Sequence, residues 1–170
     1  MTDVRYYSLV ARMRSEFPGF RVVAKSRSRL MQWIYYGLGM SLWNPRFITS
    51  FVTTIGKTVY MPVDLISSAD GYRILRHERI HILQSLRWPI LYQLSYVIPL
   101  PFLNGRWWWE LEAYTETMRV WHEDTGEVPN WLIDNIADYF VGPAYFFMFP
   151  ARFLILRMLK SRRNAILMSE

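Results

Sequence analysis

The sequence predicts an α+β fold that is mainly helical. Most of the chain carries apolar residues at the three- and four-residue spacing of amphipathic helices, whereas residues 47–61 are rich in β-branched and aromatic residues. With 170 residues, of which 52% are hydrophobic, the chain is long enough to bury a core. We therefore expect a single domain over residues 1–170, with a small β-hairpin or sheet among helices.

The composition limits the chemistry that the chain can use. It contains no cysteine and three histidines, so a metal site would have to use histidine and carboxylate ligands. The net charge of +6 favours acidic partners or anionic surfaces. Because the first residues lack the apolar stretch and cleavage site of a signal peptide, we expect the protein in the cytoplasm or within an assembled particle.

The first third of the chain reads as scaffold. Residues 3–16 have helical spacing and are followed by a Pro-Gly stop, and residues 20–24 are expected to form a short strand. A second helix, capped by Ser26 or Ser28, is expected to run through Leu38 before the glycines around it and a later Asn-Pro end it.

Residues 47–61 predict a β-hairpin. Residues 51–55 and 58–61 are the two strands, Gly56-Lys57 suits a two-residue turn with glycine first, and Pro62 closes the second strand.

The stretch His77-Glu78-Arg79-Ile80-His81 is the centre of the functional prediction. Serines and an aspartate at 67–70 can cap a helix that runs through both histidines to Pro89. On that helix His77 and His81 leave the same face one turn apart, close enough to share one divalent metal. Glu78 can hydrogen-bond a metal-bound water without binding the metal. The alternative is two partly buried histidines in an amphipathic helix.

Helical phase selects a third ligand downstream. Along residues 107–121 Glu110 lies on the mostly apolar stripe, whereas Glu112 lies nearly opposite, at ion-pairing distance along the helix from other charges. A buried, unpaired carboxylate is costly, and a metal cation is one of the few groups that would hold it there charged. Glu110 is therefore the predicted ligand, although a shift in register would exchange it with Glu112.

These residues resemble a known family. H-E-x-x-H followed by E-x-x-A and a polar residue is similar to the gluzincin metallopeptidases. The resemblance implies that His77, His81 and Glu110 bind zinc and that Glu78 is the general base. Gluzincins carry an aspartate at the position of Tyr114, where it orients a zinc-bound histidine, so this chain departs from the pattern there.

A closer resemblance is to short, single-domain proteins assigned as metallopeptidases, some from phage and bacterial genomes. They share H-E-x-x-H-x-x-Q, here through Gln84, a preceding hairpin and an E-x-E-A-Y second motif. The likeness covers about residues 50–120 and implies a minimal zincin-like domain, with a hairpin beside the H-E-x-x-H helix and a second, glutamate-bearing helix. In such enzymes a strand beside the zinc helix receives the substrate by edge pairing; the alternative is an ordinary edge hairpin.

We therefore expect a zinc-dependent metallopeptidase that acts on a peptide or protein substrate. Zinc would lower the pKa of its bound water from ~15.7 to roughly 7, and Glu78 would take the proton as the water attacks the peptide carbonyl. Tyr114, His122 and Gln84 are candidate donors around the reaction. His122 is also an alternative third ligand, or a charge partner of a helix C-terminus.

Two further segments support other interpretations. Residues 88–105 are uncharged and aromatic, but their three prolines argue against a transmembrane helix, and a short helix is expected at residues 90–97. Residues 129–170 predict helices that end in an apolar, basic segment able to contact a membrane surface or a larger assembly. The alternative function is accordingly a structural or assembly protein, such as a phage particle component, that retains zinc without turnover. No nucleic-acid recognition motif is present, so specific nucleic-acid binding is not expected.

Overall fold

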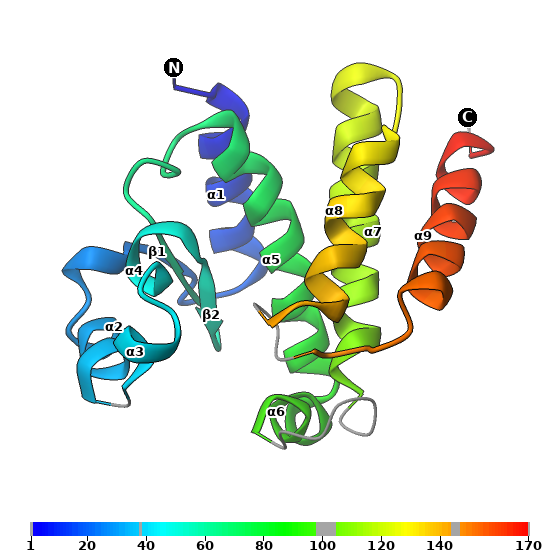
Figure 1. Cartoon of the computed structure of the whole chain (residues 1–170). Coiled ribbons are helices and arrows are strands. Elements are labelled where there is room, and N and C mark those ends of the chain that lie inside the picture. The colour runs from blue at the N-terminus through cyan, green and yellow to red at the C-terminus, as the bar shows by residue number, and fades with distance from the viewer. Residues whose placement is uncertain (1, 38, 98–104, 144–146, 170) are drawn as a thin grey trace. The chain divides into compact units, whose positions relative to one another are not determined.

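The computed structural model describes residues 2–37, 39–97, 105–143 and 147–169, which are mainly helical with one small sheet (Figure 1). The chain clusters into two compact units, Met1–Ile82 and Leu83–Glu170. Their boundary falls inside α5 (Ala69–Arg87), which is one continuous helix. The predicted α+β, mainly helical class is confirmed, whereas the single-domain organisation stays a prediction.

Helix α1 (Val4–Glu16) opens the first unit, as the sequence predicted. Asp3 caps it by accepting a hydrogen bond from the backbone N–H of Arg5 at 2.9 Å. Its inner face is apolar and includes Met13, which is fully buried. The chain turns after the helix through Gly19, whose φ of +89° is a conformation that favours glycine.

The sheet has three strands in the order β1-β3-β2. Strand β1 (Arg21–Ala24) runs parallel to β3 (Thr58–Met61), and β2 (Thr53–Ile55) runs antiparallel to it. Because β3 is central, its Val59 and Met61 side chains are fully buried. The predicted turn joins β2 to β3, and Gly56 adopts a φ of +57° there.

Part of the predicted hairpin is wrong. Residues 47–50 form a short helix, α4 (Phe47–Ser50), instead of leading into the first strand. The backbone N–H groups of Thr49 and Ser50 donate to the carbonyl of Arg46, which closes a helical turn. The helical turn places the Phe47 side chain in the buried interior, so tertiary packing outweighs the β propensity of the segment.

The predicted second helix is broken into short pieces. Ser28 caps α2 (Arg29–Gln32) by accepting from the N–H of Met31 at 3.3 Å. A π-helical turn, η2 (Trp33–Gly37), and helix α3 (Met40–Trp43) follow, and η1 (Lys25–Arg27) precedes them. Gly39 takes a φ of +68°, which interrupts the helix at the point where the glycines in the sequence predicted a weak helix. Leu38 lies outside the described residues.

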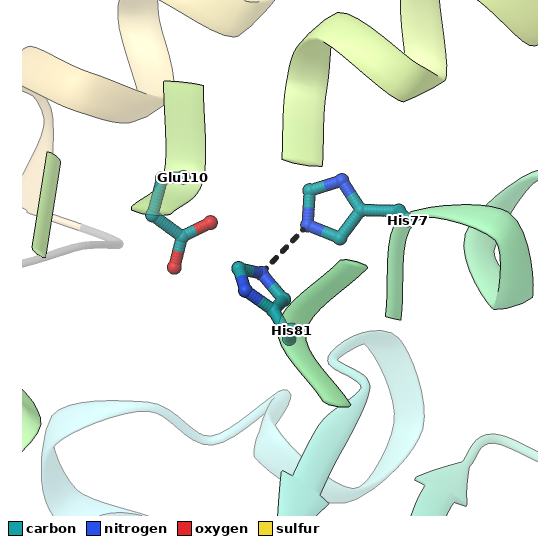
Figure 2. A group of neighbouring side chains, drawn as sticks. All are labelled: His77, His81 and Glu110. Carbon is teal, nitrogen blue, oxygen red and sulfur yellow. Dashed lines mark hydrogen bonds between the residues drawn. The ribbon is translucent and has the colours of Figure 1, made fainter. Parts of the chain in front are cut away.

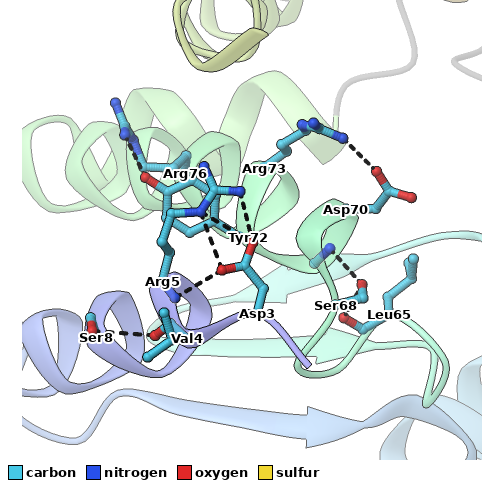
Figure 3. Close-up of polar contacts among 11 residues, drawn as sticks. Asp3, Val4, Arg5, Ser8, Leu65, Ser68, Asp70, Tyr72, Arg73 and Arg76 are labelled. Atoms are coloured by element: carbon cyan, nitrogen blue, oxygen red, sulfur yellow. Dashed lines mark hydrogen bonds and ion pairs between the residues drawn. The ribbon is translucent and has the colours of Figure 1, made fainter. Parts of the chain in front are cut away.

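The start of α5 is fixed by close contacts (Figure 3). The Ser68 hydroxyl accepts from the N–H of Gly71 at 2.9 Å and so caps the helix. A Cβ at Gly71 would lie 1.9 Å from the carbonyl oxygen of Leu65, so this position requires glycine. The Tyr72 ring lies 4.7 Å from the guanidinium of Arg5, which ties the helix to the beginning of α1. The predicted helix from the 67–70 caps to Pro89 is confirmed.

The second unit is helical. After α6 (Pro89–Val97), helices α7 (Arg106–Thr125), α8 (Asn130–Val141) and α9 (Arg152–Leu167) pack around one apolar cluster (Figure 1). Phe140 of α8 and Ile155 and Leu159 of α9 are completely buried in it. The predicted helices at 90–97 and from 129 or 130 to the Gly-Pro at 142 are confirmed. Two prolines of the 88–105 segment, Pro99 and Pro101, lie outside the described residues.

Within the described part of the chain, no helix is both long enough and apolar enough to span a membrane.

Candidate metal centre

The two histidines of α5 face each other across one helical turn. The Nε2 atoms of His77 and His81 are 3.1 Å apart, and the ring centroids are 4.8 Å apart. Both side chains are buried. Two imidazoles on one tetrahedral zinc at bond lengths of about 2.0–2.1 Å would place their nitrogens roughly 3.3 Å apart. The observed pair is therefore already close to the separation that a shared metal requires.

The third candidate ligand is held by partners from its own unit. Glu110 on α7 is only 3% exposed, and its Oε1 accepts a hydrogen bond from the Tyr96 hydroxyl at 3.0 Å. The Nε atom of Arg106, one turn earlier on α7, lies 3.6 Å from the same oxygen. Burial, and then the charge of Glu110, raise the pKa of Tyr96 well above its ordinary value, so the phenol stays protonated and donates. These contacts fix the direction of the carboxylate.

His77, His81 and Glu110 form one buried group (Figure 2). One ligand atom from each residue lies within 4.8 Å of the others. Two nitrogens and one carboxylate oxygen are ligands typical of zinc, and the group could hold a metal ion.

A second carboxylate follows His77 on α5. Glu78 is 9% exposed, and its Oε2 accepts a hydrogen bond from the Thr54 hydroxyl of β2 at 2.6 Å. A short hydrogen bond to a charged acceptor is among the stronger ones in proteins. Strand β2 therefore restrains the carboxylate that the sequence marked as the general base.

A buried lysine contacts the beginning of this strand. The Nζ atom of Lys25 donates to the Phe51 carbonyl at 2.9 Å and to the Thr53 hydroxyl at 2.8 Å, and it lies 3.5 Å from the centre of the Phe47 ring. The side chain is completely buried. Desolvation lowers the pKa of Lys25 to about 7, and the charge of Glu78 partly opposes that shift.

Gln84 uses its amide to hold α7. Its Nε2 donates to the Trp109 carbonyl at 3.0 Å and to the Glu112 carboxylate at 2.8 Å. Glu112 is exposed whereas Glu110 is buried, so the burial that helical phase predicted for the two carboxylates is confirmed. These two hydrogen bonds join α5 to α7, and the role of Gln84 as a donor around the reaction stays a prediction.

The other two candidate donors lie on α7, Tyr114 one turn after Glu110 and His122 near the end of the helix, and their roles as donors stay predictions. Tyr114 lies in the apolar cluster, where its ring stacks on Tyr139 and contacts Phe140. His122 lies in the last turn of α7, about 18 Å along the helix axis from Glu110. The structure does not bring His122 into the group of candidate ligands. Its position in the last turn suits a helix C-terminal charge partner.

Comparisons with known proteins add no assignment. The chain matches no family model, and neither curated proteins nor solved structures are similar to it. The resemblance to gluzincins stays a prediction, and the interpretation of the centre depends on its own geometry.

Sequence reasoning missed several residues that support the centre. Arg106 is four residues before Glu110, so ion-pairing spacing on one helix could have found it. Tyr96, Thr54 and Lys25 reach their partners through tertiary contacts, and no sequence spacing indicates them.

Proposed function

We propose that the chain is a zinc-dependent metallopeptidase in which His77, His81 and Glu110 hold the metal. The observation that carries this proposal is the number and kind of the ligands. Within the described residues, the buried group has three members, and a further buried carboxylate, Glu78, follows the first of them on α5. Catalytic zinc typically has three protein ligands and an open position, whereas structural zinc has four.

The chemistry follows from the residues around that group. When bound, zinc supplies the Lewis acidity that makes water a nucleophile at neutral pH. Glu78 accepts a proton from the attacking water as the oxygen bonds to the peptide carbonyl carbon. It then gives that proton to the leaving nitrogen as the carbon–nitrogen bond breaks. Thr54 keeps the Glu78 carboxylate in one orientation, and Tyr96 does the same for Glu110.

An edge strand offers a place for the substrate. Strand β2 is at one end of the sheet order β1-β3-β2, and its Thr54 contacts Glu78 directly. An extended peptide could pair with the open edge of β2 through main-chain hydrogen bonds, which impose little sequence preference. We therefore propose an unfolded or extended peptide as the substrate class.

The proposal is tested by replacing the general base, Glu78, with a residue that cannot accept the proton but leaves the metal ligands intact. Glu78→Gln should retain about one zinc per chain, because glutamine keeps the size of the side chain and Glu78 is not a ligand. Its rate of peptide hydrolysis, measured on unfolded casein, should fall by about 10² to 10⁴. Elemental mass spectrometry of parent and variant, with Glu112→Gln as an exposed control, separates loss of metal from loss of chemistry.

Two outcomes would contradict the proposal. Full activity in Glu78→Gln would remove the general-base role. A parent chain that takes up no zinc after reconstitution would contradict the metal centre itself.

A further inference from the structure

Helix α9 has two chemically different faces. Ile155, Leu159 and Ile166 point inward and are buried in the apolar cluster. The helix contains no acidic residue over its 16 residues, and Arg157, Lys160 and Arg162 on it are exposed. The inner face therefore anchors α9 to the unit, and the outer face is left to other contacts.

Only some of the cations on α9 are neutralised. Arg152 pairs with Asp138 at 2.8 Å and with Asp134 at 3.2 Å, both on α8. Arg157, Lys160 and Arg162 are exposed, and among the described residues no ion pair or hydrogen bond involves their side chains. The middle of α9 thus presents a positive charge that its own unit does not balance.

An open hollow of about 540 Å³ lies along this positive face. It combines cations, neutral hydrogen-bonding groups and apolar side chains, namely Phe153, Leu156, Arg157, Lys160, Ser161 and Asn164. These residues recur at three- and four-residue spacing and so lie on one stripe of the helix. At the start of the stripe Phe153 is 71% exposed, and Leu154 beside it is also exposed. The stripe therefore places anion-binding groups next to solvent-exposed apolar side chains.

We propose that the outer face of α9 binds the surface of an anionic phospholipid bilayer. Arg157 and Lys160 pair with phosphate headgroups while Phe153 and Leu154 enter the boundary of the acyl chains. The helix is about 24 Å long, and its inner face is occupied, so it lies along the surface. A polyanion without apolar groups, such as polyglutamate, would satisfy the cations but would leave Phe153 and Leu154 in water. The proposal is independent of the metal centre.

The experiment is partition of the full chain onto vesicles by co-sedimentation. Binding is expected to vesicles in which phosphatidylglycerol replaces part of the phosphatidylcholine, and not to phosphatidylcholine alone. The double variant Arg157→Gln/Lys160→Gln should bind roughly 30-fold more weakly, because each basic residue near an anionic surface contributes about fivefold. Phe153→Ser should weaken binding about fivefold or more through lost apolar burial. All these side chains are exposed, so the variants should fold like the parent.

A matched double variant controls for overall charge. Arg12→Gln/Arg14→Gln removes the same charge from exposed positions of α1 and should change partition by less than about threefold. An equal loss in this control would show that net charge, not α9, drives binding, and would overturn the proposal. It would also be overturned by binding to polyglutamate or single-stranded DNA that Phe153→Ser leaves unchanged, without binding to vesicles.

Discussion

The two halves of α7 bury different groups by different means. In the second half, Met118 is completely buried in an apolar cluster that includes Phe140. In the first half, Glu110 is almost as deeply buried, but its neighbours include the Tyr96 hydroxyl and the Arg106 guanidinium. One helix therefore serves both the core and the candidate centre.

The difference shows what each region requires. Apolar burial stabilises in proportion to the area removed from water, so any residue of similar shape can serve at Met118. A buried carboxylate loses its hydration, and its partners must compensate for that cost before it contributes anything to stability. The burial of a glutamate at position 110 is therefore better explained by a need for its charge than by packing.

The largest expected effect is in the apolar half. Phe140→Ala should lower the free energy of unfolding by about 3 to 5 kcal/mol, because a completely buried ring leaves a cavity. Phe153→Ala is the matched control, since the same atoms are removed from a side chain that is 71% exposed. It should cost less than about 0.5 kcal/mol. Urea unfolding followed by circular dichroism measures both, and equal costs would contradict the assignment of the core.

The elements of the fold could be predicted where one helix face or one turn determines them. Periodicity located α1, α5, α7 and α8, and the Gly56-Lys57 turn located β2 and β3. The segment at 47–50 was missed because its helical turn depends on the burial of Phe47. The break near Gly39 was foreseen only as a weakness, since the sequence does not show which pieces remain helical.

The candidate centre divides in the same way. The spacing of His77 and His81 and the inward phase of Glu110 are properties of single helices, and both could be predicted. The partners that orient the carboxylates, Tyr96 and Thr54, come from other elements through contacts that no local pattern contains. His122 shows that composition alone does not locate a site. It was a candidate because the chain has only three histidines, but the structure places it at the far end of α7.

Replacing each of the two glutamates of α7 by glutamine in turn compares a buried carboxylate with an exposed one. Glu110→Gln should weaken zinc binding by at least about 100-fold, because a neutral amide replaces a charged ligand while Tyr96 keeps a partner. Glu112→Gln removes the charge that Gln84 contacts but should leave zinc affinity within about threefold. Competition with a chromogenic chelator gives both affinities.

The reverse order of the two effects would have a clear meaning. If Glu112→Gln lost the metal and Glu110→Gln kept it, the third ligand would be the exposed carboxylate, and the buried one would be a structural partner of Tyr96.

The smallest expected effect is the pH dependence of stability that arises from Lys25, a buried cation away from the candidate metal centre. Its pKa is about 7 in the folded chain, against an ordinary value of 10.5, so between these values the unfolded state binds more protons. The free energy of unfolding should therefore rise with pH in that window, by about 1 kcal/mol from about pH 7 to about pH 8, and become flat below it. Lys25→Met should remove this rise, whereas Lys160→Met at an exposed position should keep it. Urea unfolding across that pH range measures the difference. If the free energy of unfolding depended on pH in the same way in the parent and in Lys25→Met, the prediction would be wrong. The hydrogen bonds to Phe51 and Thr53 would then keep Lys25 charged despite its burial.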